Sequence, residues 1–167
     1  MPNVIFFYRM ERWLYLHHCK YLAKIIQQFI FIIYNTKVSG KAKIGKGTVF
    51  VCSGVSCVIH DKTEIGDYCR IGLHFVVVGQ GPYKNVAKIG NKVWIGPNVI
   101  MQGPVIVGDG VIIAPGTVVN KSIPEGAIVA GVPAKIIGYT NELDYEIMDL
   151  VSSKDGWKPY LEDKSTK

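Results

Sequence analysis

Residues 59–119 read IHDKTEIGDYCRIGLHFVVVGQGPYKNVAKIGNKVWIGPNVIMQGPVIVGDGVIIAPGTVV, and an apolar residue recurs in this stretch at every sixth position. Eleven residues occupy these positions, and all are Ile or Val except Tyr83 and Met101: Ile59, Ile65, Ile71, Val77, Tyr83, Ile89, Ile95, Met101, Val107, Ile113 and Val119. A helix repeats its apolar face every three to four residues and a strand every two, so neither accounts for a period of six. A short fixed period is typical of a solenoid in which each repeat supplies one strand and one turn. The sequence therefore predicts an all-β solenoid.

Glycine and two irregularities accompany this period. A glycine directly follows the apolar residue at five positions, where we expect it to supply a turn conformation: Gly66, Gly72, Gly90, Gly96 and Gly108. The interval from Phe50 to Ile59 is nine residues instead of six, which predicts a bulge or loop within 51–58. Residues 80–87 (QGPYKNVA) keep the count but contain Gly, Pro and Asn, so they also predict a loop. Cys69 occupies a position where small or β-branched residues recur, and we interpret it as a packing residue.

The chain divides into three parts. Residues 1–36 are predicted to form a helical cap, because apolar residues recur within 4–34 at the spacing of one or two helices. Residues 37–139 form the solenoid, and 140–167 comprise a short helix and a polar tail. The first part is basic, so it has two interpretations: a cap over the open end of the solenoid, or an amphipathic helix lying on an anionic membrane face. The cap is the favoured interpretation.

The composition limits the function classes. The chain has 167 residues, 49% of them hydrophobic, and a net charge of +6, which fits one folded domain that binds an anionic ligand. Basic runs interleaved with aromatic residues are missing from the sequence, which argues against a nucleic-acid partner. We expect a cytoplasmic protein, with the inner membrane face as a second possibility, because neither a secretory signal nor a membrane-spanning segment is evident. The four cysteines lack a CxxC pair and are expected to be reduced and free of metal: Cys19, Cys52, Cys57 and Cys69.

Residues 88–138 (KIGNKVWIGPNVIMQGPVIVGDGVIIAPGTVVNKSIPEGAIVAGVPAKIIG) resemble the C-terminal half of a hexapeptide-repeat acetyltransferase. Upstream, KVSGKAKIGKGTVF (37–50) and VIHDKTEIGDYCRIG (58–72) are similar to the serine acetyltransferase branch, most of all to short members associated with bacterial surface-polysaccharide synthesis. The resemblance implies a left-handed parallel β-helix assembled as a homotrimer. It also implies that acetyl-CoA lies in a groove between neighbouring subunits, so that each active site is shared by two of them.

The resemblance assigns the donor-binding residues one by one. Ala114 and Gly116 occupy the turn that the family places against the pantetheine arm of CoA. Asn120 and Lys121 match a polar and basic pair that follows this turn, and Lys135 in GVPAK matches the basic residue near the CoA phosphates or ribose. A lysine supplies the positive charge that phosphate groups require. The predicted cofactor is therefore acetyl-CoA, with no metal.

The catalytic base is the part of the family pattern that this chain lacks. The resemblance places the family's essential His at Cys52 or Ser53, and a second functional His near Val86. A cysteine acts as a nucleophile or weak base only where a positive neighbour stabilises its thiolate, and the alternative is that Cys52 is a small buried residue. Two histidines inside the repeats, His60 and His74, are the other candidates, because a neutral imidazole has a suitable pKa near pH 7.

The leading hypothesis is an acetyl-CoA-dependent O-acetyltransferase that modifies a hydroxyl of a sugar, a glycan precursor or a similar small acceptor. Its catalytic candidates are His74, His60 and Cys52. The alternative is a catalytically degenerate trimer that binds CoA or serves as a scaffold. A carbonic-anhydrase-like metalloenzyme is disfavoured, because it needs three converging histidines and the solenoid offers two.

Overall fold

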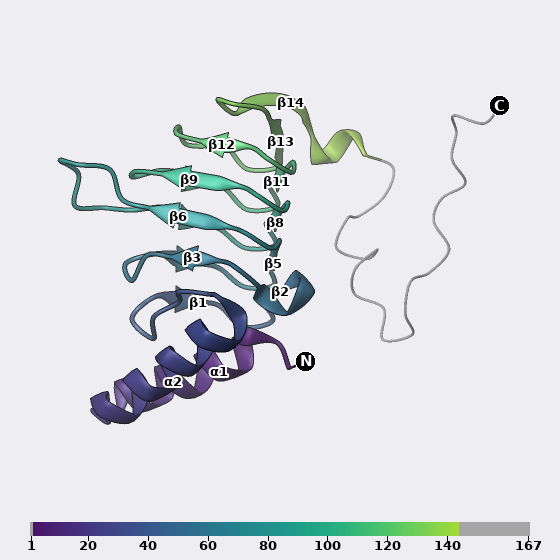
Figure 1. Ribbon diagram of the computed structural model, residues 1–167. Helices are drawn as coiled ribbons and strands as arrows, with labels where there is room; N and C mark the ends of the chain where they lie inside the picture. Colours follow the sequence, from purple (N-terminus) through teal and green to yellow (C-terminus); the bar gives the residue numbers. More distant parts are fainter. Residues whose placement is uncertain (1, 144–167) are drawn as a thin grey trace, which may run out of the picture.

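The computed structural model describes residues 2–143, which form two helices followed by a parallel β-helix (Figure 1). Helices α1 (Val4–Leu16) and α2 (Lys20–Tyr34) lie at one end of the solenoid. The strands are β1 (Lys43–Ile44), β2 (Val49–Phe50), β3 (Val58–Ile59), β4 (Glu64–Ile65), β5 (Arg70–Ile71), β6 (Val76–Val78), β7 (Lys88–Ile89), β8 (Trp94–Ile95), β9 (Ile100–Gln102), β10 (Ile106–Val107), β11 (Ile112–Ile113), β12 (Val118–Val119), β13 (Ala127–Ala130) and β14 (Lys135–Tyr139). Two short 3₁₀ segments, η1 (Val51–Gly54) and η2 (Thr140–Glu142), complete the described elements. The short helix predicted within 140–167 lies largely outside the described residues.

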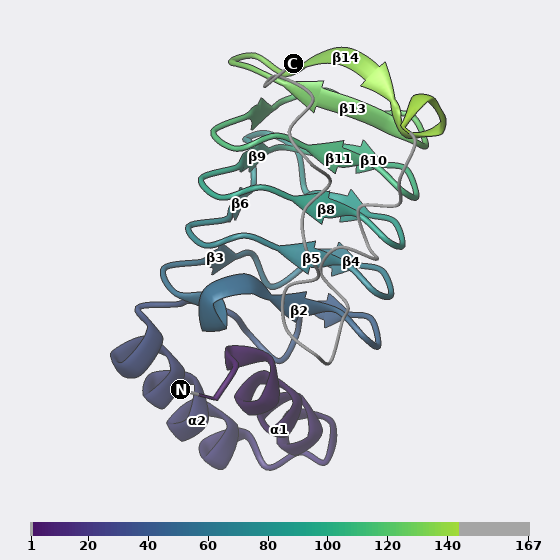
Figure 2. The ribbon, with the colours of Figure 1, turned by 90° about the vertical axis from the view of Figure 1, so that its right-hand side faces the viewer.

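The strands form three sheets, which are the three faces of the solenoid. Face 1 has the order β1-β4-β7-β10, face 2 the order β14-β13-β11-β8-β5-β2, and face 3 the order β12-β9-β6-β3. Every pairing between named strands is parallel except that of β13 with β14. Figure 2 shows the strands of successive coils stacked one above another. The predicted all-β solenoid and the N-terminal helical segment are confirmed.

The chain turns from face 2 to face 3 at one corner and from face 3 to face 1 at another. The first, which we call the His74 corner, consists of η1 and of residues 72–75, 96–99 and 114–117. The second, which we call the His60 corner, consists of residues 60–63, 79–87, 103–105 and 120–122. Candidate functional residues lie on both.

The six-residue period corresponds to one inward-facing residue per face. Ile71, Ile95 and Ile113 are at most 1% exposed and stack on adjacent strands of face 2. Tyr83 breaks this rule, because it is 59% exposed within the loop that precedes β7. The step from β6 to β7 therefore contains six additional residues. The loop predicted at 80–87 fits the six-residue count only because its added length equals one period, and it contributes no inward-facing residue at Tyr83.

The glycine that follows the inward residue is required because the backbone of the next coil approaches closely. The prediction that this glycine supplies a turn conformation is wrong. A Cβ atom at Gly96 would lie 2.6 Å from the Pro115 nitrogen and 2.9 Å from the Ile113 oxygen. At Gly72 it would lie 2.5 Å from the Pro97 nitrogen. Gly96 and Gly72 do not belong to the glycines with positive φ, so any side chain at these two positions meets the backbone of the neighbouring coil.

Replacing Gly96 by alanine is therefore expected to destabilise the solenoid by about 1–3 kcal/mol, the usual cost of overpacking a rigid interior. Gly79→Ala is the matched control, because its added Cβ would meet only Val86 Cγ1 at 3.7 Å. Urea unfolding followed by circular dichroism measures both variants. Equal stability of the two variants would contradict the explanation by close approach.

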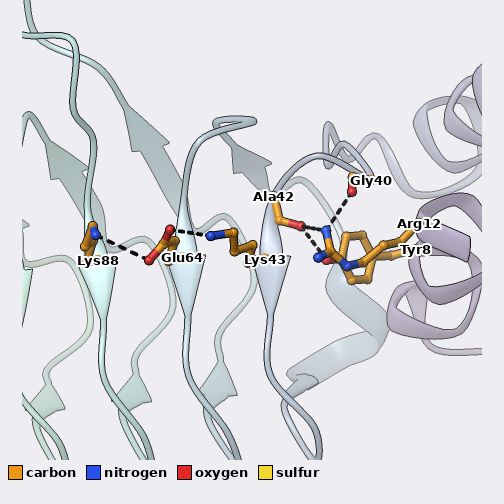
Figure 3. Close-up of polar contacts among 7 residues, drawn as sticks. All are labelled: Tyr8, Arg12, Gly40, Ala42, Lys43, Glu64 and Lys88. Atoms are coloured by element: carbon orange, nitrogen blue, oxygen red, sulfur yellow. Dashed lines mark hydrogen bonds and ion pairs between the residues drawn. The ribbon is translucent and has the colours of Figure 1, made fainter. Parts of the chain in front are cut away.

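Helix α1 supplies hydrogen-bond donors to the first coil. The Tyr8 hydroxyl donates to the Ala42 carbonyl over 2.6 Å, and the Arg12 guanidinium donates to the carbonyls of Gly40 and Ala42 over 2.9 and 2.8 Å (Figure 3). An open sheet edge leaves such backbone groups unpaired, so these contacts are those expected of a cap.

Along face 1, Glu64 bridges two lysines of neighbouring coils, at 2.9 Å and 3.4 Å: Lys43 and Lys88 (Figure 3). This network is exposed and contributes little stability.

The outer surface of the two helices is apolar. Large exposed hydrophobic side chains of α1 and α2 include Phe6, Trp13, Leu16, Tyr21, Leu22, Ile25, Phe29 and Ile32. None of the helices within residues 2–143 combines the length and the hydropathy needed to cross a bilayer. Contact of this surface with a membrane stays a prediction.

Candidate functional site

The His74 corner is a regular ladder of turns. The backbone N–H of His74 donates to Val55 (3.2 Å), that of Asn98 to Leu73 (3.0 Å), and that of Gly116 to Pro97 (2.9 Å). Each bond joins one coil to the next, and neighbouring strands lie roughly 4.8 Å apart. Turns that are far apart in the sequence are thus aligned along one edge of the solenoid.

The predicted irregularity at 51–58 forms the lower end of this edge. Three residues beyond the usual six allow η1 to form, and Cys52 and Ser53 adopt the left-handed conformation with φ of 51° and 61°. Cys52 is exposed, which corrects the interpretation that it is a small buried residue. Val51 and Cys52 at the start of η1 are exposed, whereas Gly54 at its end is buried. In the described part of the chain, the Cys52 thiol has no hydrogen bond or ion pair that would stabilise its thiolate.

His74 lies one coil above Cys52 and is held by an amide. Its Nδ1 lies 2.9 Å from Oδ1 of Asn98, which occupies the equivalent turn of the next coil. With the carbonyl oxygen as acceptor, Nδ1 carries the proton, and Nε2 is left with a free lone pair. Because the side chain is exposed, Nε2 is accessible to a substrate, so in this tautomer His74 can act as a general base.

His60 has a different environment at the His60 corner. Its Nδ1 lies 3.1 Å from Asp61 Oδ1 and also accepts the backbone N–H of Lys62 over 3.1 Å. The contact with Asp61 requires a proton on Nδ1, whereas the bond from Lys62 requires an unprotonated Nδ1. When Nδ1 of the neutral ring accepts the Lys62 N–H, the proton is on Nε2. His60 is thus less well prepared than His74 to accept a proton.

The residues assigned to the donor divide between the two corners. Ala114 and Gly116 lie two coils above His74, and a Cβ added at Gly116 would meet no atom within 4 Å, so the ladder is open there. Lys135 begins β14 opposite Ala130, which ends β13 at the upper end of the same edge. Asn120 and Lys121 are exposed at the His60 corner.

One edge of the solenoid therefore collects five of the eight site residues predicted from the sequence: Cys52, His74, Ala114, Gly116 and Lys135. His60, Asn120 and Lys121 lie on another edge of the same chain. The catalytic and binding roles of all eight stay predictions. Asn98 was missed, although its spacing of 24 residues from His74 equals that of Ile71 and Ile95, which share one register.

Two further cysteines, Cys57 and Cys69, are buried within the solenoid. Burial raises the pKa of the Cys57 thiol to about 11, and it also raises that of Cys69. The Cys69 thiol donates to the Gly90 carbonyl over 3.2 Å, consistent with a packing role. Within residues 2–143, no three His, Cys, Asp or Glu side chains lie close enough to hold a metal ion.

Comparison with protein families and curated proteins gives an independent result. Residues 87–121 match the model of the bacterial transferase hexapeptide family. A serine acetyltransferase of Helicobacter pylori is 32% identical over 132 residues, which cover 78% of this chain and 77% of that protein. Serine acetyltransferase 4 of Arabidopsis thaliana is 33% identical over 141 residues, 82% of this chain but 39% of the plant enzyme. A galactoside O-acetyltransferase of Escherichia coli is 43% identical, but over only 56 residues, 34% of this chain and 28% of that protein.

Solved structures lead to the same family. The crystal structure of serine acetyltransferase from Brucella abortus in complex with coenzyme A has a TM-score of 0.77 and 32% identity to this chain. The match covers 81% of this chain and 55% of the Brucella chain, so this chain spans about half the length of that relative. Together with the repeats in the structure, these matches confirm the predicted left-handed parallel β-helix. The chain belongs to the hexapeptide-repeat transferase superfamily, among the homologues of serine acetyltransferase.

Proposed function

We propose that the protein transfers an acetyl group from acetyl-CoA to a hydroxyl group of a small acceptor at the His74 corner. The observation that carries this proposal is the 2.9 Å contact between His74 Nδ1 and Asn98 Oδ1, on the same edge as Ala114 and Gly116. An oriented base and the turn predicted to bind the pantetheine arm therefore lie along the same edge of the solenoid. The Brucella relative with bound coenzyme A supports acetyl-CoA as the donor.

In the proposed reaction His74 Nε2 removes the proton of the acceptor hydroxyl while its oxygen attacks the thioester carbonyl. The carbon–sulfur bond then breaks, and the proton on His74 passes to the departing CoA thiolate. The negative oxygen of the intermediate needs a hydrogen-bond donor. The backbone N–H groups of His74, Asn98 and Gly116 are already used within the ladder. Asn98 Nδ2 forms no hydrogen bond in the described chain, so it is our candidate donor.

A homotrimer would unite the two corners. Within one chain, face 3 of the solenoid separates Asn120 and Lys121 from the donor residues of the His74 corner. In a closed ring of three identical subunits, one edge of each subunit meets a different edge of its neighbour. We therefore propose that CoA lies between the His74 corner of one subunit and the His60 corner of the next.

The acceptor is the finer part of the proposal. The longer matches are to serine acetyltransferases, so serine is the first acceptor to test. The chain has Cys52 or Ser53 and Val86 where the resemblance places the two family histidines, and this difference favours another acceptor. The short match to galactoside O-acetyltransferase supports a sugar or glycan precursor. A cytoplasmic location with the apolar surface of α2 on an anionic membrane fits such an acceptor.

The alternative is a degenerate member that binds CoA without turnover. It is favoured by the position of Cys52, which is exposed without a charged partner in the described chain where the family has its base. In such a scaffold the His74–Asn98 pair would have no role beyond the turn itself.

Release of the CoA thiol from acetyl-CoA, measured with serine, amino sugars and glycans in turn, separates these functions. We expect acceptor-dependent turnover, with a sugar preferred to serine. Wild-type protein that binds CoA but releases thiol no faster than buffer with every acceptor would favour the scaffold. In that case, activity gained by Cys52→His would identify a decayed enzyme.

A further inference from the structure

A cavity lies between the helical cap and the solenoid, away from the His74 corner. It has a volume of about 700 Å³ and is bounded by α1, α2, the segment before β1, and strands β3 and β6. This size is within the range of small-molecule sites, which is roughly 300–1,000 Å³. None of the residues at the His74 corner lines it, whereas His60 and Asp61 of the His60 corner do, so the cavity is separate from the proposed base but adjoins the second corner.

The wall formed by α2 is basic. Lys20, Ala23, Lys24 and Gln27 line the cavity at a spacing of three to four residues, which places them on one side of the helix. The first turn of α2 contains no acidic side chain, so nothing there offsets the positive end of the helix dipole. The cavity therefore has one wall with two lysines and a favourable helix terminus.

The opposite wall adds two more lysines from the first coil. Lys41 is paired with Asp61 over 3.6 Å, and Asp61 also contacts His60. For Lys37, as for the two lysines of α2, there is no ion pair within residues 2–143. Lys20 and Lys24 of α2 and Lys37 before β1 thus line one space without an ion pair among the described residues, and this arrangement favours a bound anion.

The remaining surfaces limit the shape of that anion. The half-buried Val58 and Val78 supply the apolar side chains of the floor, while Tyr15 and Ser39 offer hydroxyl groups. Glu11 also lines the cavity, and burial raises its pKa to about 7, so it carries less than a full negative charge at neutral pH. An apolar floor with polar groups at the sides is typical of sites for small organic ligands.

We propose that this cavity binds a phosphate-bearing molecule, with the phosphate between Lys20, Lys24 and Lys37 and the uncharged part over the floor of β3 and β6. A phosphate monoester has between one and two negative charges at neutral pH, which suits three lysines better than a single carboxylate does. Lysine binds phosphate as a point charge, without the planar geometry of arginine. The phosphate belongs either to a soluble sugar or nucleoside phosphate or to a lipid headgroup.

Isothermal titration calorimetry with glucose 1-phosphate and uridine diphosphate tests the soluble source, with glucose and uridine as uncharged controls. Sedimentation with phosphatidylcholine vesicles, with and without phosphatidic acid, tests the lipid source. The variants are Lys24→Gln and Lys37→Gln, and the matched control is Lys92→Gln, an exposed lysine between β7 and β8. All three lysines are exposed, so we expect the variants to fold, and an unchanged thermal midpoint without ligand checks this.

We expect at least one phosphate-bearing probe to bind the wild-type protein, and each cavity variant to weaken that binding at least tenfold, as loss of a charge-assisted contact does. Lys92→Gln should change it less than twofold. Binding of soluble phosphates identifies a soluble ligand, and binding of phosphatidic acid vesicles alone identifies a lipid. The proposal is overturned if no phosphate-bearing probe binds, if the cavity variants bind as well as wild type, or if Lys92→Gln weakens binding equally.

Discussion

Replacing His74 by alanine is expected to lower the maximal rate of acetyl transfer by about 10²–10⁴-fold, the usual contribution of a positioned general base. The reason is the geometry at the corner, where Asn98 fixes the proton on Nδ1 and leaves Nε2 to accept the proton of the acceptor. CoA thiol release at saturating acetyl-CoA measures this effect. The affinity for CoA should change little, because the donor-binding turn lies two coils away.

His60→Ala is the matched control, since His60 lies at the other corner and its Nδ1 is already engaged by Lys62. Asn98→Ala is expected to lower the rate less than His74→Ala, because the imidazole is retained but loses the amide that orients it. Full activity of His74→Ala would show that the base lies elsewhere. A large loss in His60→Ala alone would assign the base to the His60 corner.

Glu11→Gln is expected to stabilise the protein above pH 7 by about 3 kcal/mol, because a shift of one pKa unit corresponds to about 1.36 kcal/mol. Glu11 is 4% exposed, and its Oε1 accepts the backbone N–H of Gly40 over 2.8 Å. Oε2 is buried and finds no partner among the described residues. Burial is the main cause that raises the pKa of this carboxyl from 4.5 to about 7, and the bond from Gly40 partly opposes it.

The sign of the pH dependence follows from proton binding. Between about pH 4.5 and 7 the folded state keeps the Glu11 proton while the unfolded state has lost it. The free energy of unfolding therefore falls as the pH rises through this window and levels off above it. Glutamine resembles the protonated acid, so the advantage of Glu11→Gln should vanish near pH 4.5. Urea unfolding at a series of pH values measures this.

The control for this prediction is Glu125→Gln, an exposed glutamate on the opposite part of the solenoid. It should change the free energy of unfolding by less than about 0.5 kcal/mol at any pH, as expected for a surface substitution. If the free energy of unfolding of Glu11→Gln and of Glu125→Gln varied with pH as that of the wild type does, Glu11 would be ionised without cost in the folded state. The claim that burial raises the pKa of Glu11 would then be refuted.

The sequence was sufficient to predict the solenoid because each inward residue, such as Ile71 or Ile95, occupies the same position in a repeating unit. A period of six is a local property and needs no knowledge of distant contacts. The role of the glycines was not predictable in the same way. The constraint on Gly96 arises from the backbone of Pro115, which becomes its neighbour only after the coils stack.

The candidate site was predictable only in part for the same reason. Knowledge of the family pointed to the turn at 114–116, and the break in the period pointed to Cys52. The partner of His74 was not found, because the spacing of 24 residues is informative only once Ile71 and Ile95 are known to share one register. The cavity beneath the cap depends on how α2 packs against β3 and β6, and no sequence pattern encodes that arrangement.

The central claim is that acetyl-CoA meets its acceptor at the His74 corner, and a crystal structure with bound CoA tests it most directly. The account predicts the pantetheine arm along the turn of Ala114 and Gly116, its phosphates toward Lys135, and its thiol next to His74. CoA bound away from this corner, or with its thiol far from His74, would contradict the account.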